Sequence, residues 1–450
     1  MSSSSIGMKA LKVISWIVLV LVFIAISTLT TVDRSPIYEQ DFYKQTFERL
    51  DDLDLKSSQG DTWLAGWAKA NMTPDQPVDL VGYKPRGPYE FVLDSSYVKA
   101  ITLSNGKSRI AWLNYELLII HPFLAKEIKN AMAEAKLPID QVIFTATHTH
   151  EGMGGYMPGP IGEMAFGGFN QGIVDLMVQR SISALNTAIS SQDTVSINYR
   201  KADAGAFVAN RFIPEDPTDP FVRQLIFTKK KSGKKATFLT FSAHATSMNS
   251  NFMGLSGDYP FYLTQEMESK GYELALFAAG AVGSHRPVTK GNSPESVKDY
   301  AHELDSTINL GMTSYSTVNN PQITSALLPI SLRSPTLRIA DNIRIRPWVF
   351  NYLMGDTNAH LDITQIGNTL MIASSGEVSG VFYERWEKIA QNEGLNLIVT
   401  TFNGGYIGYI TPDKYYDRHF HEVREMNWYG PGNGQYFDQL FEAIIKKSHP

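Results

Sequence analysis

Cysteine is absent from all 450 residues of this sequence. Its absence excludes disulfide bonds, thiolate nucleophiles and zinc sites built from cysteine. Any metal that the chain binds must therefore be held by histidine, aspartate, glutamate or tyrosine side chains. The lack of cysteine is compatible with an oxidising compartment but does not by itself assign one.

An excess of basic charge is also lacking. The net charge is −5 and the pI is about 6.1, which indicates no basic surface for nucleic acid and predicts no nucleic-acid partner. Internal repeats and low-complexity segments are absent, and no oligomeric state is predicted. A content of 43% hydrophobic and 19% charged residues is typical of a globular protein, long enough for one large domain or two to three ordinary ones.

Charged residues are missing from one long segment, residues 13–32, which reads VISWIVLVLVFIAISTLTTV. Twenty uncharged residues are enough to cross a bilayer as a helix. Lys9 and Lys12 precede the segment, so the positive-inside rule predicts a cytoplasmic N-terminus and a periplasmic or extracellular remainder. A cleaved signal peptide, which would make the protein secreted, is the alternative, but no clear small-x-small cleavage site follows.

The apolar segment divides the chain into three predicted parts. Residues 1–34 form a cytoplasmic tip and a transmembrane anchor. Residues 35–60 are polar with a short helical pattern, and we expect a stalk or a flap. Residues 61–450 form the main folded domain.

Strand and helix patterns alternate along residues 61–450. Apolar runs typical of buried strands and periodic runs typical of amphipathic helices follow one another, and two hairpins are predicted. This alternation favours an α/β domain with a mixed β-sheet and flanking helices. The main predicted strands are 108–120, 141–150 and 395–410, the helices are 122–137, 170–189, 258–271 and 379–394, and the hairpins are 223–246 and 361–377.

Polar residues stand where several predicted strands end. Alternate residues of a strand share a face, so the HTH of "FTATHTHEGMGG" presents two imidazoles side by side. Sites in α/β sheets gather beyond the carboxyl ends of strands, and His, Glu and Tyr from several ends could converge on one metal ion. Taken singly, each signal also fits a structural role, such as a buried core histidine. The residues in question are His148, His150, His244, Glu377, Tyr406 and Tyr409.

The order of the motifs resembles the neutral/alkaline, non-lysosomal ceramidases. The motifs are "ATHTHEGMGG", "FSAHATSMNSN…SGDYP", "FAAGAVGSHRP", "IGNTLMIASSGEVSG" and "NGGYIGYITPDKYY…YGP", and "AKANMTPDQPVDLVGY" is similar to the opening strand of that family. The resemblance covers roughly residues 65–431. It implies an α/β catalytic domain and a zinc-dependent amidase that cleaves the N-acyl bond of ceramide, a lipid substrate. The C-terminal immunoglobulin-like domain of longer members has no counterpart in the sequence to residue 450.

The resemblance also implies roles for individual residues. One zinc ion would be held by four ligands from distant motifs, although Ser375 replaces a proline before the glutamate. The second histidine of the HTH motif would be a catalytic or substrate-contacting residue beside the metal. The implied ligands are His148, His244, Glu377 and Tyr409, and the implied catalytic residues include His150 and Arg211, the latter in "VANRF". From the residues themselves, Tyr406 is a further candidate to stabilise charge on the acyl oxygen.

The sequence departs from the family at one position. The family carries an essential serine in G-x-x-S-P-N, and laying "GSHRP" on that motif places Arg286 at the serine and Pro287 at the proline. Ser284 lies two residues earlier. Either Ser284 substitutes for the family serine, or the protein does not use one and Ser284 only caps a turn. Arg286 could instead meet an anionic group of the substrate or offset charge on the acyl oxygen.

These observations predict a membrane-anchored zinc hydrolase of an N-acyl or related acyl bond, with a lipid or other acyl amide as substrate. Two alternatives belong to other classes. A ceramidase-like protein without activity would bind zinc and a lipid or partner. An HxH metal hydrolase of the amidohydrolase type would need further ligands at later strand ends, and His285, His302 and His360 do not stand in matching contexts.

Overall fold

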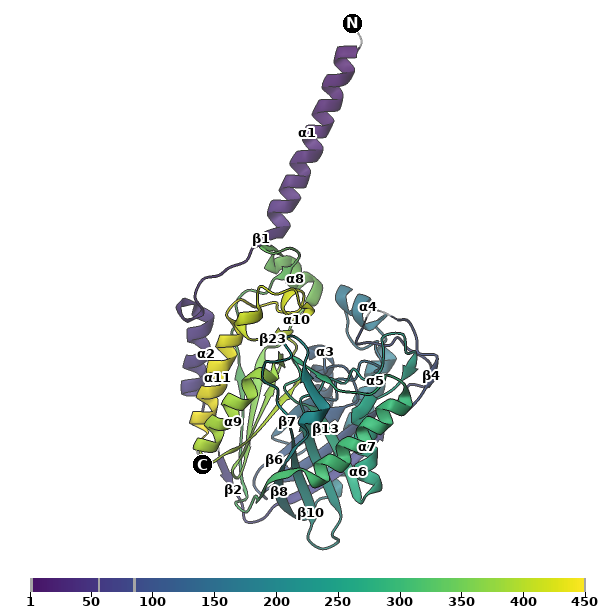
Figure 1. Ribbon diagram of the computed structural model, residues 1–450, viewed down its shortest axis with the longest axis vertical. Coiled ribbons are helices and arrows are strands. Elements are labelled where there is room, and N and C mark those ends of the chain that lie inside the picture. Colours follow the sequence, from purple (N-terminus) through teal and green to yellow (C-terminus); the bar gives the residue numbers. More distant parts are fainter. Residues whose placement is uncertain (1–2, 56, 84–85, 449–450) are drawn as a thin grey trace.

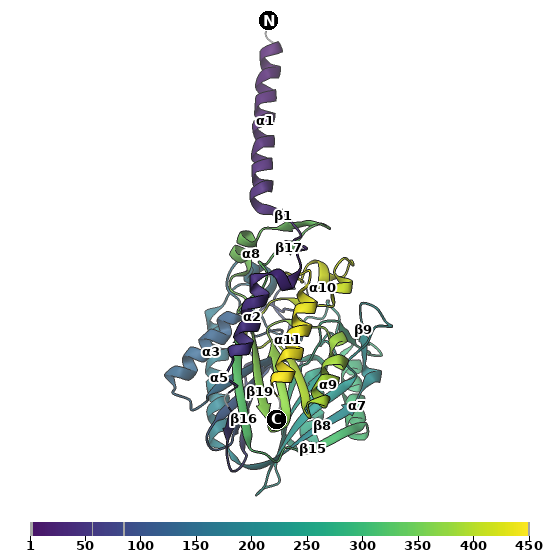
Figure 2. The same ribbon diagram turned by 90° about the vertical axis from the view of Figure 1, so that its left-hand side faces the viewer.

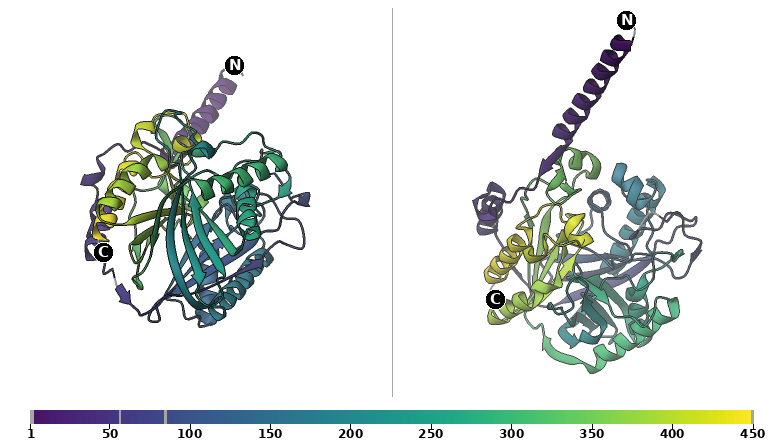
Figure 3. Two further views of the ribbon diagram at one scale, coloured as in Figure 1. Left: turned by 60° about the horizontal axis from the view of Figure 1, so that its bottom comes forward. Right: turned by 45° about the horizontal axis from the view of Figure 1, so that its top comes forward.

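Two β-sheets packed face to face, with helices on both outer faces, make up the domain of this computed structural model, which describes residues 3–55, 57–83 and 86–448 (Figure 1, Figure 3). The larger sheet runs in the order β13-β11-β10-β8-β3-β5-β6-β7, with β15 also paired to β8. Its strands are β3 (Leu64–Asn71), β5 (Tyr97–Ser104), β6 (Arg109–Tyr115), β7 (Gln141–Ala146), β8 (Asp193–Asp203), β10 (Phe221–Lys229), β11 (Lys235–Phe241), β13 (Tyr272–Ala279) and β15 (Met312–Thr317).

The smaller sheet has the order β2-β16-β19-β20-β22. Its strands are β2 (Ser57–Gln59), β16 (Gln322–Pro329), β19 (His360–Ile366), β20 (Thr369–Ser374) and β22 (Asn396–Thr401). Both sheets mix parallel and antiparallel pairs. Both predicted hairpins are present, as β10–β11 and β19–β20, and the α/β fold with a mixed sheet and flanking helices is confirmed.

Alternation of apolar residues along the strands explains the layers. Trp112 and Ile143 point into a core shared with Ile398 of the smaller sheet, whereas their neighbours Leu113 and Phe144 point to the opposite face. Both faces of each central strand are therefore buried, which is why these strands read as continuous apolar runs.

Helices cover the outer faces of the two sheets (Figure 1, Figure 2). The larger sheet packs against α3, α5, α6 and α7, and the smaller sheet packs against α9 and α11. The helices are α1 (Ser3–Thr28), α2 (Asp41–Asp52), α3 (Pro122–Glu134), α4 (Pro160–Phe166), α5 (Gln171–Ser190), α6 (Asp258–Ser269), α7 (Pro294–Leu310), α8 (Pro347–Met354), α9 (Tyr383–Asn392), α10 (His421–Arg424) and α11 (Asn433–Lys447).

Strong curvature of the larger sheet brings its two edge strands close together. Asn114 of β6 donates from Nδ2 to the carbonyl of Phe277 in β13, over 2.8 Å. Strand β22 lies beside both edges, and Thr401 donates to the carbonyl of Ala279 at the end of β13. The carboxyl ends of β7, β11, β20 and β22 are thereby gathered in one region.

The N-terminal helix projects from the domain, as Figure 1 and Figure 2 show. Residues Met8–Thr28 are apolar enough to cross a membrane, and the apolar window is not buried by the rest of the chain. The segment for which a stalk or flap was predicted contains α2 and β2, which pack on the domain: α2 lies along α11 and buries Thr46 and Leu50, while β2 pairs with β16.

Candidate metal centre

Four strand ends supply the side chains of the candidate site. His148 and His150 follow β7, and His244 follows β11. Glu377 begins the short strand β21 (Glu377–Val378), which pairs in parallel with β23 (Tyr409–Ile410), so that Glu377 stands opposite Tyr409. The first and last of these residues, His148 and Tyr409, are more than 250 positions apart in the chain, and the curved sheet explains why they meet.

His148 and His244 face each other with their Nε2 atoms 2.8 Å apart. The Nδ1 atom of His148 lies 2.7 Å from the carbonyl of Leu118, and that of His244 lies 3.0 Å from the carbonyl of Val282. A carbonyl only accepts, so each Nδ1 carries the proton and each Nε2 presents a lone pair. Two lone pairs at this distance repel unless a cation lies between them.

A proton is a poor candidate for that cation. Burial, together with the charge of Arg211, holds the pKa of His244 well below its ordinary value. Both imidazoles are buried, and backbone carbonyls that accept a hydrogen bond from Nδ1 in this way orient metal-ligating histidines in proteins. The pair therefore fits a divalent metal ion.

His150 completes a cluster of three imidazoles. Its Nε2 lies 3.4 Å from Nε2 of His148, and one nitrogen from each of the three rings lies within 4.8 Å of the others. Unlike its two neighbours, which are fully buried, His150 is only partly buried. Desolvation of the ring, with His148 and Arg211, lowers the pKa of His150 well below its ordinary value, so the ring is neutral.

Glu377 adds a carboxylate to the cluster. Its Oε2 is buried, forms no hydrogen bond with the described residues, and lies 3.5 Å from His148 Nε2 and 3.6 Å from His244 Nε2. Its Oε1 accepts a hydrogen bond of 2.6 Å from Tyr406. Burial alone would raise the pKa of Glu377, but His148 and Tyr406 outweigh it, and the pKa lies below its ordinary value. Glu377 is therefore an ionised carboxylate, whose Oε2 can bind a metal ion.

Tyr409 and Arg211 form the opposite side of the site. The Tyr409 hydroxyl lies 3.4 Å from His244 Nε2 and accepts a hydrogen bond of 3.2 Å from Arg211. The guanidinium of Arg211 also pairs with Glu422 of α10 at 2.8 Å. This places a positive charge beside the cluster.

The backbone is strained at two residues of the site. His148 and Phe402 both have positive φ, at 62° and 66°, and Phe402 stacks on the His148 ring with centroids 4.2 Å apart. Non-glycine residues in this conformation persist only where their surroundings hold them, and they gather at functional sites. The stacking fixes the plane of the His148 imidazole.

Ser284 and Arg286 lie differently from the residues above. Ser284 is fully buried, and its hydroxyl contacts Ser379 Oγ at 2.6 Å and His285 Nδ1 at 3.2 Å. Arg286 is exposed on β14 (His285–Pro287), and its guanidinium donates to the carbonyl of Pro287. The hydrogen bonds of neither side chain connect it to the histidine cluster.

Several residues around the site were not singled out from the sequence. Arg86 donates to the carbonyl of His150 and has its Nη1 3.9 Å from Oε1 of Glu151, which is buried beside Asp258. Burial and Asp258 raise the pKa of Glu151 well above its ordinary value. The signal for Glu151 was its place directly after the HTH motif. No sequence signal pointed to Phe402 or Glu422, because only the fold brings Phe402 to His148 and Glu422 to Arg211.

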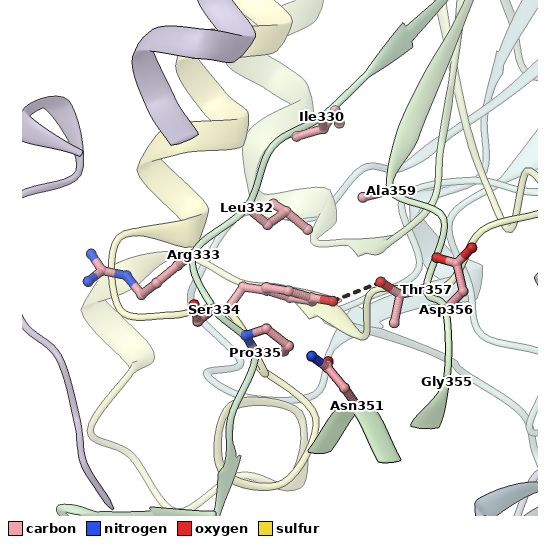
Figure 4. Close-up of a pocket in the computed structure, with 11 residues that line it drawn as sticks. Ile330, Leu332, Arg333, Ser334, Pro335, Asn351, Gly355, Asp356, Thr357 and Ala359 are labelled. Atoms are coloured by element: carbon pink, nitrogen blue, oxygen red, sulfur yellow. Dashed lines mark hydrogen bonds between the residues drawn. The ribbon is translucent and has the colours of Figure 1, made fainter. Parts of the chain in front are cut away.

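A cavity of about 460 Å³ lies apart from the histidine cluster (Figure 4). It is bounded by the segment around Leu332 and by the end of α8 and the loop after it, from which Asn351 and Thr357 reach in. The carbonyl of Thr357 accepts a hydrogen bond of 2.8 Å from the backbone of Tyr406. The cavity wall is thus bonded to the residue that holds Glu377.

Comparison with known proteins identifies the family of the chain. Residues 63–309, more than half of the chain, match the neutral/alkaline non-lysosomal ceramidase family, N-terminal. The chain belongs to this family. The resemblance stated from the motifs is therefore confirmed, and the protein is a ceramidase-like hydrolase. The matched segment contains His148, His150, Arg211 and His244, whereas Glu377 and Tyr409 lie beyond it.

Two solved structures share the fold of this ceramidase-family protein. The neutral ceramidase from Pseudomonas aeruginosa superposes with a TM-score of 0.70 at 16% identity, covering 86% of this chain and 74% of that one. A structure described as ceramidase complexed with C2 superposes with a TM-score of 0.69, also at 16% identity, covering 86% and 75%. At this identity the likeness establishes the fold.

Proposed function

We propose that this protein is a membrane-anchored, zinc-dependent hydrolase that cleaves the N-acyl amide bond, or a related acyl bond, of a ceramide-like lipid. Family membership supports the substrate class, since the related structures are named ceramidases. The observation that carries the proposal is the His148–His244 pair, whose two Nε2 lone pairs stand 2.8 Å apart beside the ionised Glu377.

The donor set favours zinc among the divalent metals. Imidazole nitrogen and carboxylate oxygen are ordinary zinc ligands, and a catalytic zinc keeps one position open. We assign the ligands as His148, His244, Glu377 and Tyr409. Zinc bound there would polarise an acyl carbonyl and lower the pKa of water.

The remaining residues of the site would handle protons and charge. The neutral His150 is placed to take a proton from the attacking water at Nε2 and to pass it to the leaving amine. The charge of Arg211 would offset the negative charge that develops on the acyl oxygen. Tyr406 would act as a positioning residue, because its hydroxyl fixes Glu377.

Helix α1 would hold the enzyme at the membrane that contains its substrate. Its apolar span, Met8–Thr28, has 21 residues with a mean hydropathy of 2.6, and Lys9 and Lys12 lie in the first turns of this span. We infer a cytoplasmic N-terminus and a catalytic domain outside the cytoplasm. Cleavage after α1 would instead give a secreted enzyme, and sequencing the mature N-terminus distinguishes the two.

The test is hydrolysis of a panel of N-acyl lipids and acyl esters, with the bound metal measured in the same samples. Wild type should hold about one zinc per chain and release fatty acid, while His148→Ala should lose both. His302→Ala, at an exposed histidine that pairs with Glu266, is the matched control and should behave as wild type. Equal turnover by His148→Ala and wild type would remove the zinc mechanism.

A second candidate is a zinc- and lipid-binding protein without activity. Ser284 favours it, because its buried hydroxyl bonds Ser379 and His285 and the family serine then has no counterpart in the side-chain contacts of the histidine cluster. Wild type that binds zinc but releases no fatty acid from any member of the panel would support this candidate. Turnover of any member would exclude it.

A further inference from the structure

The end of α1 is fixed rigidly to the domain. The chain passes directly from α1 into β1 (Leu29–Thr31), which pairs with β18 (Ile343–Ile345). The last carbonyls of a helix lack partners within the helix; here Arg346 donates to those of Ile26 and Thr28, and Trp348 donates to that of Ser27 at 2.8 Å. The domain therefore cannot swing freely about α1.

Exposed apolar side chains surround this junction. Trp348 and Tyr352 are 57% and 74% exposed and, four residues apart on α8, share one face of that helix. Ile339 and Ile343, 52% and 42% exposed, belong to the hairpin of β17 (Leu337–Arg338) and β18. We call these four residues the collar. Figure 1 and Figure 2 place α8, β1 and β17 at the end of the domain from which α1 emerges.

The length of α1 sets the level at which the collar lies. Its 21-residue apolar span is about 30 Å long at 1.5 Å per residue, which equals the hydrocarbon thickness of a bilayer. If α1 spans the bilayer, Thr28 stands at the membrane surface, and Trp348, bonded to Ser27, stands at the same level. Trp and Tyr are enriched at this interface because one end of each ring system is apolar and the other polar.

We propose that the collar lies in the interface of the bilayer that α1 crosses. The domain then has one fixed orientation relative to the membrane and takes its lipid substrate from that surface. This inference rests on the anchoring role given to α1 above. The collar is also joined to the site through the loop that follows α8. In this loop the carbonyl of Thr357 accepts a hydrogen bond from the backbone N–H of Tyr406, and the Tyr406 hydroxyl donates to Glu377. One loop thus connects the helix that carries Trp348 and Tyr352 with the residue that bonds Glu377.

Lipid contact can be measured directly, because the chain has no cysteine and a single one can be introduced and labelled. The variants are Tyr352→Cys and Ile339→Cys, each as full-length protein with a fluorophore on the new cysteine. Each is placed in nanodiscs that hold one chain per disc. Part of the lipid in these discs bears a nitroxide on its acyl chain, which quenches a fluorophore that contacts it. Ser232→Cys in the β10–β11 turn, far from α1 (Figure 1), is the control. We expect the nitroxide lipid to quench both collar labels at least threefold more strongly than the control label.

Quenching equal to that of the control would overturn the proposal, whatever the enzyme activity. A collar that binds a second copy of the chain instead of lipid would also give no quenching. Each disc holds one chain, so no second copy can bring the label into the bilayer. A label that prevented folding at one collar position would be recognised by circular dichroism, and the other position would then decide.

Substrate delivery is tested by Ile339→Ser/Tyr352→Ser, a double variant that leaves the hydrogen bonds to α1 intact. Hydrolysis of an N-acyl lipid in vesicles should fall about tenfold, since polar residues replace two interfacial apolar side chains, while hydrolysis of a water-soluble short-chain amide should not change. Unchanged hydrolysis of the vesicle lipid would overturn delivery through the collar. If wild type hydrolysed neither substrate, the proposed function would fail, and the quenching result would still decide the membrane contact.

Discussion

The Nε2 atoms of His148 and His244 lie 2.8 Å apart, although the carbonyls of Leu118 and Val282 keep both protons on the opposite nitrogens. Folding brings these lone pairs together at a cost that a shared cation would remove. Because the unfolded chain has no such site, metal binding and folding are coupled.

Removal of metal should therefore destabilise the protein. With zinc at about a thousand times its dissociation constant, binding adds about 4 kcal/mol to the free energy of unfolding, and a chelator should lower the melting temperature of wild type accordingly. Readdition of zinc should restore it, as measured by scanning calorimetry with metal analysis. His244→Ala should melt at one temperature with or without zinc. A wild type that also melts at one temperature would contradict the metal site.

Ser284 and Arg211 should differ sharply when substituted. The Ser284 hydroxyl is buried against Ser379 and His285, so Ser284→Ala should change kcat/KM less than about fivefold, far below the loss expected for a nucleophile. Arg211→Gln, which removes a charge beside Tyr409, should lower kcat by about a hundredfold while zinc content is kept. Steady-state kinetics and metal analysis of both variants provide the check. A thousandfold loss in Ser284→Ala would return the serine to the mechanism.

Most of the secondary structure could be predicted from local sequence patterns, because the spacing of apolar residues follows from which face of each helix or strand is buried. The division into two sheets could not be predicted in this way. Central strands of both sheets, such as β6 and β20, are buried on both faces, and nothing in the composition of β15 and β16 assigns them to different sheets. The tight curvature that joins β6 to β13 depends on contacts such as Asn114 to Phe277, between residues 163 positions apart.

The candidate site was partly accessible from sequence for a related reason. His148, His244, Glu377 and Tyr409 each follow a strand, and the structure brings all four together. Side-chain direction within the turns was not accessible. Ser284 and Arg286 are two residues apart, yet one is buried and the other is exposed, because the β14–β9 pairing fixes the backbone there. The 35–60 segment is polar overall, and Leu50 is buried through the packing of α2 against α11 and β16.

Lys99 should be important for stability because it neutralises a buried carboxylate. Its Nζ lies 3.0 Å from Oε1 of Glu116, and both side chains are 1% exposed. Lys99→Met would leave Glu116 unpaired at a cost of about 3–5 kcal/mol. The double variant Lys99→Met/Glu116→Gln removes both charges of the pair, so most of the lost free energy of unfolding should be recovered. Chemical denaturation of the two variants and wild type measures it, and a double variant no more stable than the single one would contradict the account.

Asp94 should give the protein a stability that falls as the pH rises. Burial raises the pKa of Asp94 to about 7 despite its hydrogen bonds from Ser256, Gly257 and Tyr262. Between about pH 4 and pH 7 the native carboxyl keeps a proton that the unfolded chain has released. The native state then binds more protons than the unfolded state, so the free energy of unfolding decreases across this window and levels off above it.

Asp94→Asn should remove this slope, because the amide is neutral at every pH and the hydroxyls of Ser256 and Tyr262 can turn to accept from it. The expected gain over wild type grows by about 1.4 kcal/mol per pH unit through the window, and denaturant midpoints from pH 4 to pH 8 measure it. Asp175→Asn, at an exposed carboxylate of α5, should keep the slope of wild type. If Asp94→Asn kept it too, another buried acid, such as Glu151, would have to be the group that titrates.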